Sequence, residues 1–96
     1  MTAYWVSHYS EILDNDKMAA YAALAGPALI GAGGTFLARD PSEHDYEVGG
    51  PGRVVIIRFE SMEAAVAAHE SPAYQEALAA LDGAAIRSIR LIPGIA

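Results

Sequence analysis

A few histidines and arginines are the side chains of this sequence best suited to chemistry. His8 ends an apolar stretch near the N-terminus, and Arg39 and Arg53 flank a glycine-rich loop at 40–52. Histidine can carry a proton near neutral pH, and arginine can hold a carboxylate or an enolate. A site that joined His8 to Arg39 would therefore have a candidate catalytic group and a candidate substrate-binding group.

Other candidates for substrate binding are Tyr46, Arg53 and His69. Tyr46 and His44 lie on the 40–52 loop, which could cover such a site. His69 follows an apolar stripe on a predicted helix, so it is either a histidine at the edge of the core or an acid–base group or ligand. The three histidines share no short metal-binding spacing, and we expect no metal site.

The predicted elements alternate in the order β-α-β-β-α-β. Strands are expected at 3–9, 35–39, 53–60 and 86–92, with helices from Asp14 to Ile30 and from Ser61 to Leu81, the latter starting afresh at Ser71-Pro72. This order predicts one α+β, ferredoxin-like domain over residues 1–96. Its antiparallel sheet has the strand order 4-1-3-2, with both helices on one face.

Strand direction and alternation then place the candidate residues. The first two strands run parallel, so His8 and Arg39 should lie at the same end of the sheet, together with Arg53 and Arg87. Simple alternation puts His8 and Arg39 on the open face, beneath the 40–52 loop. The structural alternative is that His8 only ends a strand and that Arg39 pairs with an acidic neighbour.

The strand 53–60 is apolar on both faces, which predicts cover on both sides of the sheet. We assign Trp5, Phe36, Val55, Ile57 and Phe59 to the helix side. The open side then carries an apolar patch formed by Tyr4, Val6, Leu37, Val54 and Ile56. A second copy of the same face would cover this patch, so we expect a homodimer; the alternative is a monomer with an exposed apolar sheet.

Composition excludes several classes of function. The formal net charge is −6, which disfavours nucleic acid as a partner. Cysteine is absent, and no apolar run reaches the length of a membrane span, so we expect a cytoplasmic protein without a membrane partner. No glycine-rich phosphate loop precedes a helix, and we expect no cofactor.

Several motifs resemble a known family. Gly33-Gly34-Thr35-Phe36-Leu37-Ala38-Arg39 and Ser71-Pro72-Ala73-Tyr74-Gln75 are similar to the bacterial family called domain of unknown function 1330. The resemblance implies a ferredoxin-like fold of the dimeric α/β-barrel superfamily, which includes cofactor-free monooxygenases, isomerases and haem-using enzymes. The sequence departs from the family pattern at Asp40 and at Ala67-Ala68-His69-Glu70.

Two classes of function remain open. One is a cofactor-free enzyme, monooxygenase-like or isomerase-like, that acts on a small anionic or enolisable metabolite in the barrel pocket. The other is a homodimeric ligand-binding or regulatory module without turnover. The residues do not separate the two.

Overall fold

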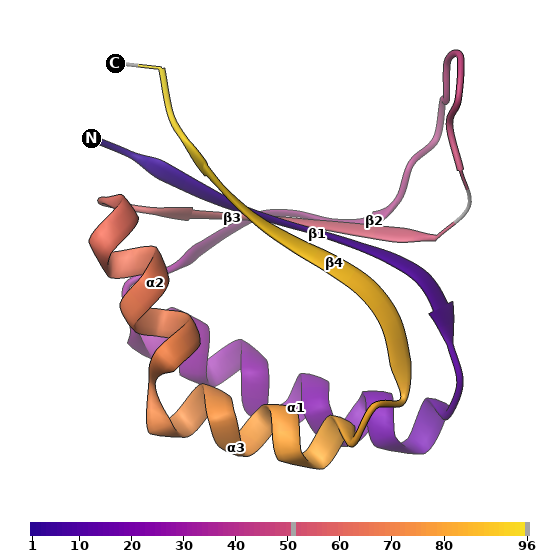
Figure 1. Cartoon of the computed structure of the whole chain (residues 1–96), viewed down its shortest axis with the longest axis horizontal. Coiled ribbons are helices and arrows are strands. Elements are labelled where there is room, and N and C mark those ends of the chain that lie inside the picture. Colours follow the sequence, from indigo (N-terminus) through magenta and orange to yellow (C-terminus); the bar gives the residue numbers. More distant parts are fainter. Residues whose placement is uncertain (51, 96) are drawn as a thin grey trace.

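The computed structural model describes residues 1–50 and 52–95. The elements are β1 (Ala3–Ile12), α1 (Asn15–Gly31), β2 (Thr35–Pro41), β3 (Arg53–Phe59), α2 (Met62–Glu70), α3 (Pro72–Leu81) and β4 (Ala85–Pro93). The four strands form one antiparallel sheet in the order β2-β3-β1-β4, which confirms the predicted topology. All helices cover one face of the sheet, and the loop after β2 rises on the other side (Figure 1).

Local signals set the helix boundaries. The Asp14 carboxylate accepts hydrogen bonds from the backbone N–H groups of Asp16 and Lys17 at 3.0 and 3.1 Å, and so caps α1. Ser71 ends α2, and its hydroxyl accepts from the Tyr74 N–H at 3.2 Å, which starts α3 at Pro72. The predicted second helix is therefore two helices that meet at Ser71.

The Gly-Gly turn before β2 has a packing role. A Cβ at Gly34 would lie 2.9 Å from both the Leu29 carbonyl oxygen and Phe59 Cζ. Only a residue without a side chain allows this close approach between the end of α1 and β3. Gly34 thus fixes where β2 enters the sheet.

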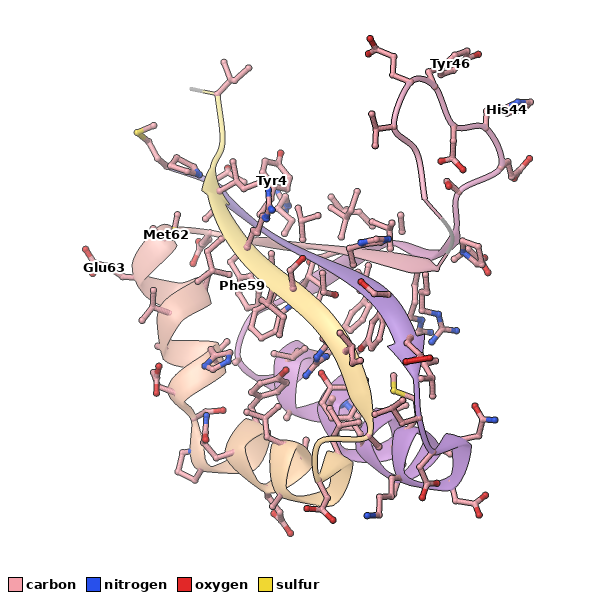
Figure 2. All side chains as sticks on the ribbon, turned by 45° about the vertical axis from the view of Figure 1, so that its right-hand side comes forward. Tyr4, His44, Tyr46, Phe59, Met62 and Glu63 are labelled. Atoms are coloured by element: carbon pink, nitrogen blue, oxygen red, sulfur yellow. The ribbon has the colours of Figure 1, made fainter. Side chains whose placement is uncertain are left out.

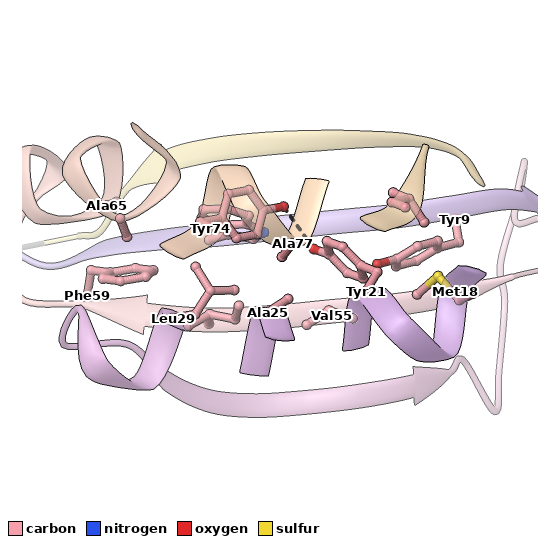
Figure 3. Close-up of a cluster of buried hydrophobic side chains, with 14 of the residues drawn as sticks. Tyr9, Met18, Tyr21, Ala25, Leu29, Val55, Phe59, Ala65, Tyr74 and Ala77 are labelled. Carbon is pink, nitrogen blue, oxygen red and sulfur yellow. Dashed lines mark hydrogen bonds between the residues drawn. The ribbon is translucent and has the colours of Figure 1, made fainter. Parts of the chain in front are cut away.

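The core fills the space between the sheet and the helices (Figure 3). Trp5, Ile57 and Phe59 are each 1% exposed, which confirms their assignment to the helix side. Tyr4, Val6 and His8 pair with Arg58, Ile56 and Val54, so these residues share the open face. The predicted division of β1 and β3 between two faces is correct.

A β-bulge in β2 overturns one prediction. Phe36 pairs with Ile57 and Ala38 with Ile56, so Leu37 and Ala38 together stand opposite a single residue of β3. The extra residue shifts the alternation, and Arg39 pairs with Val55 on the helix side. The expectation that Arg39 shares the open face with His8 is therefore wrong.

The first strand is also longer than predicted. It continues to Ile12, beyond the predicted end at residue 9, through a register shift between Tyr9 and Glu11. None of the helices in the described part of the chain combines the length and the apolar character of a membrane span.

Candidate functional site

A cavity lies between α1 and the helix side of the sheet. Its aromatic lining comes from Trp5, Tyr9, Tyr21 and Phe36, and Met18, Ala25 and Leu29 contribute apolar surface from α1. Ser7 lines it as well and is 2% exposed. The cavity leaves about 50 Å³ for the centres of water-sized molecules, which is room for a few waters.

Two arginines, Arg39 and Arg53, join this apolar lining. Arg39 reaches it because of the bulge, and Arg53 lies on the same side of β3 as Val55. The Arg39 guanidinium lies 5.0 Å from the centre of the Phe36 ring, a cation–π contact. The ion pairs found within residues 1–50 and 52–95 join Lys17 to Asp82 and His69 to Glu70, so neither arginine is neutralised by a carboxylate there.

A third arginine stands behind the cavity wall. Arg87 pairs with Tyr9 across β4 and β1, and its Nη1 donates to the hydroxyls of Tyr9 at 2.8 Å and Tyr21 at 2.9 Å. Its Nη2 donates to the Tyr74 hydroxyl at 3.2 Å. Tyr21 and Tyr74 share a further hydrogen bond of 2.8 Å, drawn in Figure 3. We call Arg87, Tyr9, Tyr21 and Tyr74 the arginine–tyrosine cluster.

Burial raises the pKa values of two phenols in the cluster, Tyr9 and Tyr21. Burial raises the pKa of Tyr21, and the neighbouring Tyr74 raises it further. Burial also raises the pKa of Tyr9, with a second contribution from Tyr21. Burial by itself lowers the pKa of Arg87, but the tyrosine oxygens outweigh it, and the guanidinium stays charged. The cluster is thus one cation among neutral hydroxyls.

The predicted site residues divide between two sides of the sheet. Arg39 and Arg53 line the cavity, whereas His8 pairs with Val54 on the open face and does not. His44 and Tyr46 stand on the loop that rises away from the helices (Figure 2). Tyr46 is 84% exposed and does not line the cavity. The structure therefore brings together two of the five candidates.

A wider hollow lies beneath the 40–52 loop, where the site had been expected. Its lining includes Arg39, which also lines the helix-side cavity, together with Asp40, Glu43, His44, Val54 and Ile56. It is open to solvent, and its two carboxylates outnumber the single arginine, which disfavours an anion. The helix-side cavity is the better candidate because it is less open to solvent, aromatic and flanked by two cations.

His69 lies at the edge of the core. Its ring centre is 5.6 Å from that of Trp5 and 5.2 Å from that of Tyr74, and its Nδ1 is 3.6 Å from a Glu70 carboxylate oxygen. It does not line the cavity, although Trp5 does. Of the two interpretations of His69, this placement favours the structural one.

The arginine–tyrosine cluster was missed by reasoning from sequence. Arg87 had been placed at the correct end of the sheet, but its partners come from three other elements, β1, α1 and α3. The available signal was a side-chain pattern: alternation puts Arg87 on the same face as Ile89 and Leu91, which face the core. An arginine in that position requires polar partners.

The fold is ferredoxin-like, and solved structures share it. A protein of unknown function from Rhodopseudomonas palustris, RPA0582, matches with a TM-score of 0.74 and 16% identity, covering 99% of this chain and 83% of that one. SnoaB, a cofactor-independent oxygenase from Streptomyces nogalater, matches with a TM-score of 0.69 and 13% identity, covering 99% of this chain and 94% of SnoaB. A dimeric protein of unknown function and ferredoxin-like fold from Bacteroides fragilis matches with a TM-score of 0.54 and 9% identity, covering 94% of this chain and 93% of that one.

The chain belongs to the family called domain of unknown function 1330 (DUF1330), which it matches over residues 2–95. This confirms the family suggested by the glycine and Ser-Pro motifs. The comparison with curated proteins found no match. Because the solved structures are so distant in sequence, their likeness establishes the fold alone.

The cluster predicts late ionisation of Tyr9 and Tyr21. Tyr9 and Tyr21 have raised pKa values, so they should stay protonated above pH about 10, where exposed tyrosines ionise. The unfolded chain loses these protons first, so the unfolding free energy should fall as pH rises beyond about 10. Tyrosinate absorbance measured against pH, in buffer and in denaturant, checks this.

Tyr21→Phe should remove one late-ionising group from that titration, whereas Tyr46→Phe, on the exposed loop, should leave the late ionisation unchanged. Ionisation of Tyr9 and Tyr21 near pH 10 in the folded protein would show that the cluster does not form.

Proposed function

We propose that this protein binds a small planar organic anion, a carboxylate or an enolate, in the helix-side cavity. The observation that carries the proposal is the pair Arg39 and Arg53, which flank an aromatic cavity without carboxylate partners in the described residues. Arginine presents a planar fork that matches a carboxylate or enolate. The aromatic lining suits a flat apolar body.

The charge distribution supports an anionic ligand. The chain carries a formal net charge of −6, so its overall field repels anions. Even so, Arg39, Arg53 and Arg87, half of its six basic side chains, lie on the helix side at one end of the sheet. Such a local concentration of cations in an acidic protein favours an anion at this end of the sheet, which the ligand would supply.

The size of the cavity limits the ligand. Pockets for drug-sized molecules measure roughly 300–1,000 Å³, far more than the space available here. Arg39 is exposed, so its side chain can swing aside, and an added Cβ at Gly26 of α1 meets no atom within 4 Å. A single-ring compound is therefore the appropriate class of ligand.

The lining also bears on catalysis. Among the described residues it contains no histidine and no carboxylate, so it offers no ordinary general base. His8, the candidate base, is on the other face of the sheet. A binding module is therefore the simpler function. A cofactor-free enzyme is the second candidate, with a substrate that ionises readily and an enolate oxygen that faces the hydroxyls of Tyr9 and Tyr21.

Replacing Arg53 tests the proposed anion site. Arg53→Gln removes a charge-assisted hydrogen bond, so the Kd for benzoate or a related aromatic carboxylate should rise roughly 10- to 100-fold. Arg58→Gln is the matched control, because Arg58 is exposed on the same strand and pairs with Tyr4 on the open face. Isothermal titration calorimetry of the three proteins gives the comparison. Equal affinities for the Arg53 and Arg58 variants would contradict the assignment.

We also propose that two copies of the chain associate through the open face. Tyr4, Val6, Val54 and Ile56 share that face, and Leu37 beside them is 53% exposed. Such a contiguous apolar surface is typical of an interface. The Bacteroides fragilis protein of the same fold is described as dimeric.

A charge at the centre of the open face should separate the copies. Ile56→Glu would bury an unpaired carboxylate in the interface, a change that costs several kcal/mol. Light scattering should give twice the chain mass of 10.1 kDa for the unaltered protein and 10.1 kDa for the variant. Val66→Glu, at an exposed position of α2, is the control and should remain a dimer. An unaltered protein of 10.1 kDa at micromolar concentration would disprove the dimer.

A further inference from the structure

The arginine–tyrosine cluster contains more donors than acceptors. Arg87 donates three hydrogen bonds, one to each of the hydroxyls of Tyr9, Tyr21 and Tyr74. Guanidinium is a donor only, so each hydroxyl oxygen is the acceptor and keeps its own proton to give. No ion pair within residues 1–50 and 52–95 joins Arg87 to a carboxylate.

Counting the hydroxyl protons shows the excess. The cluster has three such protons, and the 2.8 Å contact between Tyr21 and Tyr74 uses one of them. A hydrogen-bonding contact between the Tyr9 and Tyr21 hydroxyls can use a second one. At least one proton therefore remains for a partner outside the cluster. Either oxygen of the Tyr21–Tyr74 contact can be the donor, so when Tyr74 donates to Tyr21 and Tyr21 to Tyr9, the spare proton lies on Tyr9.

A spare proton on Tyr9 would lie at the cavity wall. Tyr9 and Tyr21 both line the cavity, and in Figure 3 their rings lie side by side between α1 and the sheet. Their hydroxyls accept from the same Arg87 nitrogen, which holds the two oxygens close together. A hydrogen bond from a guanidinium polarises the hydroxyl that accepts it and makes that hydroxyl a stronger donor. The wall is therefore built to donate toward a ligand oxygen.

We infer that this wall binds the ionised oxygen of a phenol or an enol, with the Tyr9 hydroxyl as a donor and Arg87 as the counter-charge. The inference rests on the proposed function, binding of an anion in this cavity, and adds the class of ligand and the place of its charge. The charged side chains of the described lining are Arg39 and Arg53, which have the same sign as Arg87. All three favour the ionised ligand over the neutral one.

A coloured phenol gives a direct test. 4-Nitrophenol absorbs visible light when ionised, so its pKa in the presence of saturating protein can be read from absorbance against pH. Binding to the unaltered protein should lower that pKa by about one unit or more, which equals a tenfold or greater preference for the anion. Tyr9→Phe keeps the ring and removes the donor, so it should reduce the preference roughly tenfold.

Tyr4→Phe is the matched control, since Tyr4 lies on the open face of the same strand, and it should leave the preference unchanged. If Tyr9→Phe fails to fold, the pKa of 4-nitrophenol bound to the unaltered protein still tests whether the cavity prefers the ionised phenol. Binding of 4-nitrophenol without a lowered pKa would overturn this inference and leave the proposed function standing. If neither 4-nitrophenol nor benzoate binds, both fail.

Discussion

The arrangement of this protein depends on one inward-facing cation, Arg87, that has no carboxylate partner in the described residues. Burying a guanidinium is costly unless its N–H groups are satisfied. Here three phenol hydroxyls satisfy it, and each comes from a different element: Tyr9 from β1, Tyr21 from α1 and Tyr74 from α3. The cation therefore ties two helices to the sheet. The Arg87 guanidinium also places positive charge beside the cavity, and the three tyrosine hydroxyls hold a proton that a ligand can accept.

A second constraint is the bulge in β2. One extra residue opposite Ile56 moves Arg39 from the open face to the helix side, where it joins Arg53 at the cavity. Without the bulge, the lining would have a single arginine and the open face an additional charge. The same irregularity thus concentrates cations at the cavity and removes one charge from the open face, which still carries Arg58 and Arg90.

The fold could be predicted from sequence because its signals are local. The capping Asp14, the Ser71-Pro72 start and the apolar strand 53–59 each specify an element by itself. The candidate site could not be predicted from sequence, because the bulge in β2 and the arginine–tyrosine cluster depend on the tertiary structure. The bulge at Leu37 has no glycine or turn residue to announce it, and alternation without a bulge puts Arg39 on the wrong face. Likewise, no short motif connects Arg87 with tyrosines that are 13 to 78 residues away.

The central claim is that the ligand lies between α1 and the sheet, and not under the 40–52 loop. The most direct measurement is the set of intermolecular nuclear Overhauser effects between the ring protons of bound benzoate and the methyl groups of the protein. The account predicts contacts with the methyls of Met18, Leu29 and Ile57, which line the helix-side cavity. Contacts with Val54 and Ile56 in place of these would put the ligand on the open face and contradict it.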